Sequence, residues 1–491
     1  MPGVRIFPFK EVESGSQVVE NLIFEARGSP HLFAADGVSG LVNVDFTPET
    51  ATRVAAAFGT ALKRGARVVA SRESPAACRM IKRAMISGLT STGVEVADLR
   101  VLPAPVGRHL LKSHGYDGGF HVGISPTDPE AVRVQFFEPP GIELTDAMQK
   151  EVEKHFTRLE FRRMAAADVG GITYPARARE SYADDLLASV DVGAIRTRRF
   201  KVVIDYGYSA ASFVLPLLLG PLGVEAVAAH EFSPNLPTGE SAALRSLVGQ
   251  AKRLVAATGA DLGVVFDRSA ERLYLIDDHA REIPVEQALL LYLRLIGGNG
   301  KRGKLAFPVT VTSQVDRLVE GSALEVVRTP ASLAALTKAA AENEVIFAGA
   351  VGGGYLFPEF LPAYDAMASL CKLLELLAPI DRPLSELVSD LPESHVVHRR
   401  VPCPWAQKGL VMRVLTERLK DRDIDLSDGI KIFDERGWAQ VLPDPDEPVV
   451  HVYAEGADEE SSAQLEQELR ELVETVLEEG EEVRAAPQSS T

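Results

Sequence analysis

The chain has 491 residues and a mass of 53.0 kDa, too large for one hydrophobic core and enough for three or four domains of about 100 to 150 residues. A hydrophobic share of 46% with 25% charged residues excludes wholesale disorder and a fibrous repeat. The formal charge of -17 repels a phosphate backbone at long range, so broad nucleic-acid binding is not expected.

The three cysteines are too few and too far apart for a disulfide framework, which predicts a reducing compartment, the cytoplasm. No signal segment opens the chain, and prolines and glycines interrupt the most apolar stretch, residues 211–229. We therefore expect no membrane partner.

The first predicted segment, residues 1–28, has an apolar residue at about every sixth position, which is typical of a hexapeptide β-helix. Two or three such coils cannot bury a core alone. The segment is interpreted either as a contact between two copies of the chain or as the remnant of a longer architecture.

Three later stretches repeat a strand, helix and strand pattern, at residues 67–96, 201–227 and 307–327. Such units pair parallel strands, which predicts three consecutive mixed-sheet α/β domains. The expected limits of these domains are 29–178, 179–297 and 298–388.

The remaining residues, 389–491, predict an α+β domain. A helix is expected at 410–419, with strands at 430–433 and 449–453. Leucines and valines at helical spacing predict a last helix over 461–479, whose glutamates form its solvated face.

Each predicted domain carries one short segment of polar and small residues: 123–128 (GISPTD), 267–272 (DRSAER), 349–354 (GAVGGG) and 442–448 (LPDPDEP). With Asp36-Gly37-Val38-Ser39-Gly40, these segments resemble the active-site loops of the α-D-phosphohexomutases, the phosphomannomutases and phosphoglucomutases. The resemblance extends from about His31 over nearly all of the chain. It implies four domains around a central cleft, a phosphoserine that donates to a hexose phosphate, a magnesium ion and a hexose 1,6-bisphosphate activator.

In the first loop, the resemblance places Ser125 at the nucleophile position, but Pro126 stands where the family has histidine and Gln135 where it has lysine. Ser39 likewise replaces an arginine at the entrance. A hydroxyl without a positioned proton acceptor is a poor nucleophile at neutral pH. Without the resemblance, Ser125 is interpreted as an ordinary turn serine that precedes a proline.

The second loop resembles a metal loop with three alternating carboxylates, which stand here as Asp267, Ser269 and Glu271. One anionic ligand is lost, so the predicted magnesium affinity is weak. The alternative interpretation is an exposed turn with an Asp-Arg or Glu-Arg pair. The resemblance makes the following Arg272 a substrate-binding residue.

The third and fourth loops resemble the sugar and phosphate loops. The third keeps Gly353 but lacks both hydroxyl-reading side chains. In the fourth, Leu442 replaces arginine and two aspartates replace serine and threonine, and the resemblance leaves Glu447 and His451 as substrate-binding positions. Added carboxylates repel a phosphate group by roughly 1 kcal/mol or more for each close pair.

The start of the chain also resembles the junction in bacterial proteins that join a mannose-1-phosphate guanylyltransferase to a degenerate mutase domain. The resemblance implies a protein of hexose-phosphate and GDP-mannose metabolism with weak or no mutase turnover, which acts in binding, regulation or assembly. Its expected partners are a hexose phosphate, a guanylyltransferase or a second copy of the chain. The alternative is an active phosphohexomutase that transfers phosphoryl groups between C1 and C6 through Ser125.

Overall fold

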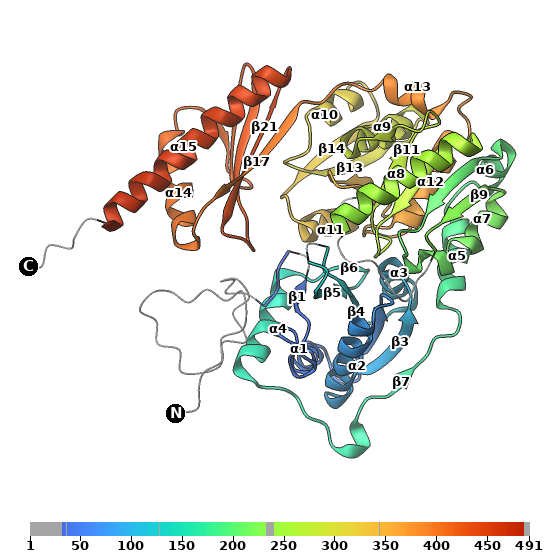
Figure 1. Cartoon of the computed structure of the whole chain (residues 1–491). Helices are drawn as coiled ribbons and strands as arrows, with labels where there is room; N and C mark the ends of the chain where they lie inside the picture. Colours follow the sequence, from blue (N-terminus) through green and yellow to red (C-terminus); the bar gives the residue numbers. More distant parts are fainter. Residues whose placement is uncertain (1–31, 36, 127, 232–239, 343, 486–491) are drawn as a thin grey trace, which may run out of the picture.

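The structure is a computed structural model that describes residues 32–485 apart from residues 36, 127, 232–239 and 343. The predicted β-helix-like segment, residues 1–28, lies outside the described residues. Four sheets follow one another along an arc (Figure 1), from the first at the bottom through the second at the right and the third at the top to the last at the upper left.

The first sheet has seven strands in the order β1-β5-β4-β2-β3-β7, with β6 paired to β5. Strand β2 runs parallel to β3 and β4, so the first predicted crossover is confirmed, and β4 and β5 form an antiparallel hairpin. The strands are β1 (Val38–Leu41), β2 (Arg67–Arg72), β3 (Glu95–Val101), β4 (Gly118–Ile124), β5 (Ala131–Glu138), β6 (Ile142–Glu143) and β7 (Ile172–Thr173). The helices are α1 (Pro48–Ala61), α2 (Ala76–Ser91), α3 (Ala104–His114) and α4 (Asp146–Arg158), with a 3₁₀ turn at Ala166–Asp168.

Successive side chains of β2 face opposite sides of this sheet, as strand geometry requires. Val68 and Ala70 join the core under α1 and α2. Val69 joins a second core that continues through the next two sheets. The first three units therefore share one continuous apolar core.

The second sheet has the order β12-β11-β10-β8-β9, with β8 parallel to both β9 and β10. Strands β10 and β11 form an antiparallel hairpin. The strands are β8 (Lys201–Asp205), β9 (Glu225–Ala229), β10 (Leu262–Phe266), β11 (Leu273–Ile276) and β12 (Glu282–Ile283). The helical elements are α5 (Ala178–Ala188), α6 (Val192–Arg198), a 3₁₀ turn (Ala210–Phe213), α7 (Pro216–Leu222), α8 (Glu240–Thr258) and α9 (Val285–Gly298).

The third sheet has the order β14-β13-β15-β16. Its first strand begins four residues earlier than predicted, because Leu305 and Ala306 are buried in the sheet, and it ends at Pro308. The strands are β13 (Gly303–Pro308), β14 (Leu324–Thr329), β15 (Val345–Gly349) and β16 (Tyr355–Leu356). The helices are α10 (Gln314–Val319), α11 (Leu333–Glu342), α12 (Ala366–Leu377) and α13 (Leu384–Ser389).

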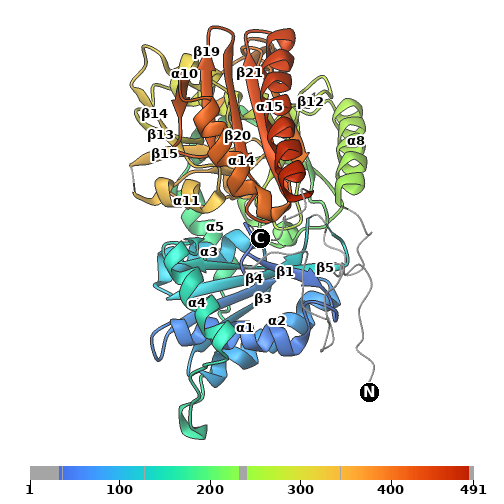
Figure 2. The same ribbon diagram turned by 90° about the vertical axis from the view of Figure 1, so that its left-hand side faces the viewer.

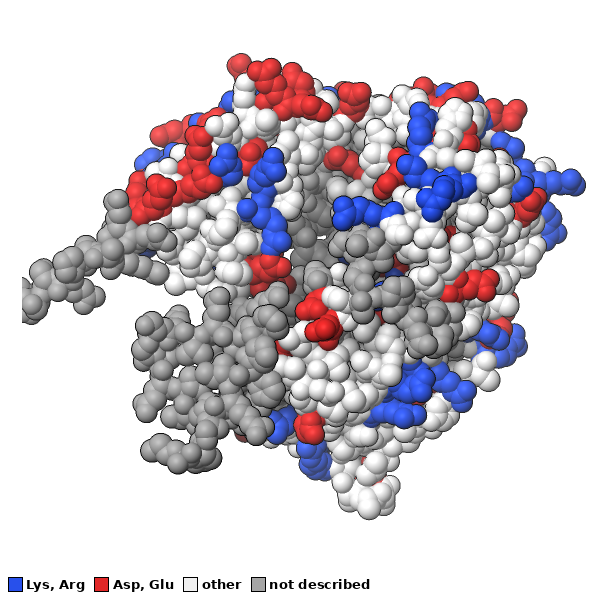
Figure 3. All heavy atoms as spheres, in the orientation of Figure 1, with Lys and Arg blue, Asp and Glu red and all other residues white. Residues whose placement is uncertain are grey.

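The last sheet is antiparallel in the order β17-β21-β20-β19-β18 and has its own core. The predicted last helix forms, and its leucines and valines pack on the sheet, while Figure 3 shows acidic side chains gathered over it. The strands are β17 (Val396–Pro402), β18 (Asp423–Asp425), β19 (Ile430–Asp434), β20 (Gly437–Pro443) and β21 (Val449–Gly456). The helices are α14 (Trp405–Arg418) and α15 (Glu459–Ala485).

Buried polar groups join this last unit to the third one. The Glu455 carboxylate accepts from the Thr312 hydroxyl and from the backbone N–H of Ser313, the latter at 2.8 Å. Lys431 Nζ donates to the carbonyl of Val309 at 2.7 Å. Figure 2 shows the last sheet standing over the first one, on the same side of the molecule.

The predicted fold class, three mixed-sheet α/β units and a C-terminal α+β unit, is confirmed. Among the described residues, no helix combines the length and apolar character needed to cross a membrane.

Candidate active site

Ser125 lies at the start of the turn between β4 and β5, and its backbone N–H donates to the carbonyl of Ala131 at 2.9 Å. Its side chain is buried. The two neighbours of Ser125, Ile124 and Pro126, line a cavity of about 220 Å³ that Asp267 also lines. The first and second predicted loops therefore meet at one cavity.

Glu73, at the end of β2, is a site residue that the sequence analysis missed. Its carboxylate is buried and accepts from the backbone N–H of Ile124 at 3.2 Å. A Cβ atom at Gly123 would lie 2.5 Å from Glu73 Oε1, so only glycine leaves room for this carboxylate. Glu73 thus fixes the backbone next to Ser125.

Asp267 folds the turn between β10 and β11 around its own carboxylate. Oδ1 accepts from the backbone N–H groups of Glu271 at 2.8 Å and Arg272 at 3.0 Å, and Oδ2 accepts from Ser269 Oγ at 2.8 Å. Burial and the charge of Glu271 raise the pKa of Asp267. Both oxygens of Asp267 are therefore occupied by donors of its own loop.

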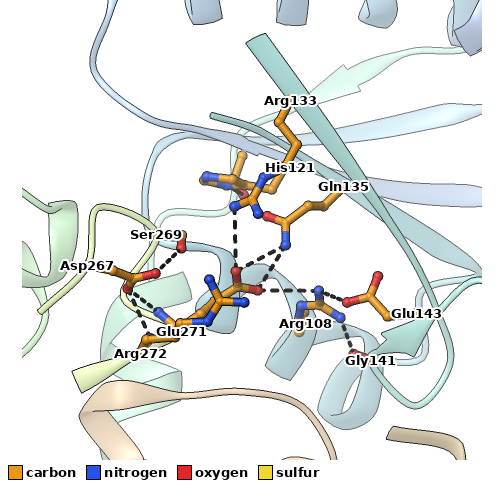
Figure 4. A network of polar contacts seen from close by, with 11 residues as sticks. Arg108, His121, Arg133, Gln135, Gly141, Glu143, Asp267, Ser269, Glu271 and Arg272 are labelled. Atoms are coloured by element: carbon orange, nitrogen blue, oxygen red, sulfur yellow. Dashed lines mark hydrogen bonds and ion pairs between the residues drawn. The ribbon is translucent and has the colours of Figure 1, made fainter. Parts of the chain in front are cut away.

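Glu271 is held by side chains of the first unit (Figure 4). Its carboxylate accepts from Gln135 Nε2 at 3.0 and 3.2 Å and from Arg108 Nη2 at 3.3 Å. Arg133 Nη2 lies 3.8 Å from Oε2. Arg108 comes from α3, and Arg133 and Gln135 come from the same face of β5. We call Arg108, Arg133, Gln135 and Glu271 the guanidinium clamp.

The clamp is buried: the side chains of Arg108, Arg133 and Glu271 are 1%, 7% and 7% exposed. Arg108 is also held by Glu143, by the carbonyl of Gly141 at 3.0 Å and by the ring of Phe137 at 4.0 Å. Burial raises the pKa of Glu271, but Arg108 and Arg133 outweigh this effect and hold the pKa below its ordinary value. Glu271 is therefore an ionised carboxylate whose charge is balanced by arginine.

His121 lies beside the clamp as a neutral ring. Its Nδ1 is 2.8 Å from the Ser71 hydroxyl, and burial lowers its pKa to about 3. Within the described residues its Nε2 has no hydrogen-bond partner. Because the ring is uncharged at neutral pH, it adds no positive charge beside Arg108 and Arg133.

The side-chain oxygens of this loop, from Asp267, Ser269 and Glu271, do not fit the ligand set of a magnesium ion. Magnesium requires near-octahedral oxygen ligands. Asp267 already accepts three hydrogen bonds within its own loop, Ser269 is neutral, and Glu271 is engaged with two guanidinium groups. Among the described residues, no group of three or more His, Cys, Asp or Glu side chains is placed to hold a metal ion. In the alternative prediction the exposure of the turn is wrong, since Ser269 and Glu271 are buried, but Glu271 does pair with arginine, through Arg108 and Arg133.

Gly353 joins the third loop to the second. Its carbonyl accepts from the backbone N–H of Leu273 at 2.9 Å, and Gly354 forms a bridge with Arg272. A Cβ atom at Gly353 would lie 2.6 Å from the Leu273 carbonyl oxygen, and its φ is +81°. The close approach of the two loops thus requires glycine. The Arg272 guanidinium lies 5.9 Å from the Tyr364 ring centre.

The fourth loop is closed by Asp444. Asp444 Oδ1 accepts from the backbone N–H groups of Asp446 and Glu447, each at 2.7 Å, and Oδ2 lies 2.8 Å from His451 Nε2. Lys408 Nζ donates to the carbonyls of Asp444 and Glu447, and the Glu447 side chain pairs with Arg400. The backbone N–H groups of Asp446 and Glu447, which could bind a phosphate oxygen, therefore already donate to the Asp444 carboxylate.

A series of contacts connects the loops. Asp446 Oδ2 accepts from the backbone N–H of Ala35 at 2.5 Å, which joins the fourth loop to the entrance segment. Gly37 packs against β5, where a Cβ atom would lie 2.2 Å from the Val134 carbonyl oxygen. Gln135, the next residue of β5, contacts Glu271. All four predicted loops thus meet around one region, although Glu447 and His451 make no described contact with the second or third loop.

Three family models match the chain: phosphoglucomutase/phosphomannomutase α/β/α domain I over residues 30–163, domain II over residues 180–280 and domain III over residues 286–395.

Curated relatives cover most of the chain. A phosphoglucomutase/phosphomannomutase from Thermococcus kodakarensis is 31% identical over 442 residues, which are 88% of this chain and 96% of the relative. A probable phosphoglucosamine mutase from Methanopyrus kandleri is 29% identical and covers 91% of this chain and 98% of its own.

Solved structures share the fold. A phosphoglucomutase/phosphomannomutase family protein from Burkholderia thailandensis superposes with a TM-score of 0.77 at 20% identity, covering 91% of this chain and 97% of its own. An Aspergillus fumigatus N-acetylphosphoglucosamine mutase, solved with GlcNAc-6P and magnesium, gives 0.58 at 12% identity, covering 91% and 96%.

Proposed function

Because the chain belongs to the phosphoglucomutase/phosphomannomutase family, we propose that it binds hexose phosphates in sugar-nucleotide metabolism, of the GDP-mannose type, with weak or no mutase turnover. Its role would be binding, regulation or assembly in the cytoplasm. The proposed division of the chain is at residues 28, 178, 297 and 388.

The guanidinium clamp is the observation that carries this proposal. Mutase chemistry in this family, as the resemblance implies, needs a divalent cation between the phosphoserine and the second loop. Here Arg108 and Arg133 balance the charge of Glu271, and Asp267 caps its own backbone. Binding of a cation by Glu271 would break its ion pairs with the buried guanidinium groups of Arg108 and Arg133, which is unfavourable even though Arg108 keeps its pair with Glu143.

The closed fourth loop supports the same proposal. A phosphate group would have to displace the Asp444 carboxylate from two backbone N–H groups and would meet the negative charges of Asp444 and Asp446. Arg272 and His451 are the proposed remaining ligand contacts, with Gly353 and Glu447 shaping the loops. A mannose-1-phosphate guanylyltransferase, or a second copy of the chain through residues 1–28, is the proposed protein partner.

The test is a mutase assay with glucose 1-phosphate, glucose 1,6-bisphosphate and magnesium, together with the intact mass of the purified chain. We expect turnover at least about a thousandfold below the roughly 10 s⁻¹ that is usual for enzymes, and no phosphate on Ser125. The Ser125→Ala variant is expected to match the wild type in both readouts. Turnover near 10 s⁻¹ that Ser125→Ala abolishes would contradict the proposal.

The second candidate function is an active phosphohexomutase that uses Ser125 as its nucleophile and Asp267, Ser269 and Glu271 as a weakened metal site. It is favoured by the cavity that the first and second loops share. The names of the two relatives, a phosphoglucomutase/phosphomannomutase and a probable phosphoglucosamine mutase, also favour it. The match with this chain covers 96% and 98% of their lengths. The same assay decides between the two functions.

A further inference from the structure

Strand β7 ends the first sheet, and the residues around it expose apolar side chains. Figure 1 shows β7 at the outer side of this sheet, on the segment that leads to α5. Among the described residues, eight large hydrophobic side chains are exposed, and three of them are Val169, Ile172 and Tyr174, at 49%, 46% and 57%. We call residues 169–174 the β7 edge. Apolar side chains gathered in this way mark a surface that a partner can cover.

The β7 edge is held firmly by the body of the first unit. The backbone N–H of Gly170 donates to the carbonyl of Thr90 at 3.0 Å, and the N–H of Val96 donates to the carbonyl of Gly171 at 2.9 Å. A Cβ atom at Gly170 would lie 2.0 Å from the Val94 carbonyl oxygen, so the segment packs closely on its neighbour. Because the backbone is already fixed, little conformational entropy is lost when a partner binds.

The register of β7 turns the backbone groups of Ile172 toward the open edge. Strand β7 is parallel to β3, with Ile172 beside Val96. Since Val96 donates to Gly171, the groups of β7 that face β3 belong to Gly171 and Thr173. The N–H and C=O of Ile172 therefore point away from β3. Outward-facing groups of this kind are a template for a further strand.

The charge that usually discourages such pairing is missing from β7. Sheet edges are commonly protected by charged side chains. Four strands that end the other sheets, β9, β12, β14 and β18, each contain glutamate or aspartate. Strand β7 consists of isoleucine and threonine alone. It is thus an edge that can accept another strand.

The sequence of the β7 edge is complementary to itself in the antiparallel direction. Around a two-fold axis at Ile172, Ile172 of one copy lies opposite Ile172 of the other, which is an apolar pair. The same register places Tyr174 opposite Gly170 of the second copy. Glycine has no side chain, so the tyrosine ring has room to lie over the neighbouring strand.

The charges at the two ends of this segment favour the same direction. Asp168 precedes the β7 edge and Arg177 follows it. Antiparallel pairing brings the Asp168 end of each copy to the Arg177 end of the other, whereas parallel pairing would bring like charges together. Their present partners, Arg64 for Asp168 at 3.2 Å and Asp184 for Arg177 at 3.8 Å, are exposed ion pairs. Exposed pairs are weak and compete little with new ones.

From these observations we infer that the β7 edge binds a second copy of the chain, by antiparallel pairing of β7 with β7 around a two-fold axis at Ile172. The two first sheets then form one continuous sheet. This contact is separate from the one proposed for residues 1–28. It also does not depend on whether the chain has mutase activity, because β7 carries none of the four loops.

The experiment is analytical ultracentrifugation of the full chain between about 1 and 100 μM. We expect a species of twice the 53.0 kDa mass of the chain, with a Kd of about 10 μM or lower. Ile172→Lys places two like charges opposite each other and is expected to weaken the dimer at least about tenfold. Leu426→Lys is the matched control, because Leu426 is 53% exposed and follows β18 in the last unit; its Kd should equal that of the wild type.

A cysteine at the axis tests the register directly. Residues that exchange both hydrogen bonds across an antiparallel pair have Cα atoms about 5.5 Å apart, which is within the range of a disulfide. Oxidised Ile172→Cys is therefore expected to run as a covalent dimer on a non-reducing gel. Leu426→Cys should stay monomeric, and the three native cysteines are buried.

The inference is overturned by a wild type that sediments at 53.0 kDa over the whole concentration range. It is equally overturned by a dimer that Ile172→Lys leaves as tight as Leu426→Lys does, or by a dimer in which Ile172→Cys forms no cross-link. The mutase assay remains the separate test of the proposed function, since neither measurement uses a hexose phosphate.

Discussion

Replacing Arg108 by methionine is expected to lower the free energy of unfolding by about 3 to 5 kcal/mol. Arg108 is 1% exposed and also contacts Glu143 and the carbonyl of Gly141. Its removal takes one of two guanidinium partners from the buried Glu271 carboxylate and an ion-pair partner from Glu143. Urea unfolding followed by circular dichroism measures the change.

Arg294→Met is the matched control, because Arg294 is an exposed arginine in α9. Its effect is expected to stay within about 0.5 kcal/mol. Adding Glu271→Gln to Arg108→Met should recover part of the loss, since the uncompensated charge is then removed. An Arg108→Met variant as stable as Arg294→Met would show that the clamp does not hold the two sheets together.

The effect of Arg108→Met should also depend on pH. The folded chain holds the pKa of Glu271 below the ordinary value of 4.5, so the clamp stabilises the fold above that value and loses its contribution as the pH falls through the lower, folded value. The difference between wild type and variant is therefore expected to be full at pH 7 and to shrink in acid. A difference that grows as the pH falls would have the opposite sign and would contradict the assignment of an ionised Glu271.

Replacing Asp444 by serine is expected to strengthen the binding of glucose 6-phosphate by about tenfold or more, which is about 1.4 kcal/mol. The change removes a carboxylate from the fourth loop and releases the backbone N–H groups of Asp446 and Glu447 for a phosphate oxygen. It also releases His451 Nε2 from its contact with Asp444. Isothermal titration at constant salt measures both Kd values.

Asp423→Ser provides the matched control, because Asp423 is an exposed aspartate of β18, a strand at the edge of the same sheet. It removes the same charge from the unit and should leave the Kd unchanged within about twofold. An Asp444→Ser variant that binds no more tightly than Asp423→Ser would show that the fourth loop is not a masked anion site.

Much of the fold follows from local sequence patterns. The predicted crossovers at β2 and β8 begin with runs of valine, and in all three crossovers a helix joins two parallel strands. At the third crossover the β-branched run used for the prediction, residues 309–311, lies after the strand β13. The start of β13 was predicted four residues too late. Gly303 and Lys304 are typical of a linker, and only two apolar residues, Leu305 and Ala306, separate them from the predicted start. The hairpin turns that carry Ser125 and Asp267 were located through the resemblance of their residues to the family's loops.

The partners of Glu271 could not be found in the same way. The guanidinium clamp joins residues that are 136 and 163 positions apart, which no local pattern reports. One signal was present: Arg133 and Gln135 alternate with apolar residues in a strand that is buried over most of its length. Polar residues on one face of a buried strand require partners from another element.

Glu73 was missed for a different reason. Its role depends on Gly123, which admits the carboxylate toward the backbone beside Ser125. A single glycine near the end of a strand does not indicate which side chain lies against it. That contact becomes visible only when the neighbouring strand is placed beside it.

The most direct test of the account is the binding of magnesium itself. The central claim is that Arg108 and Arg133 supply the positive charge that a bound cation would otherwise supply to the Glu271 carboxylate. Titration of the purified chain with MgCl₂, followed by calorimetry at pH 7.5, is predicted to show no saturable binding up to about 10 mM. A one-to-one site with a Kd below about 1 mM that Glu271→Gln abolishes would contradict the account.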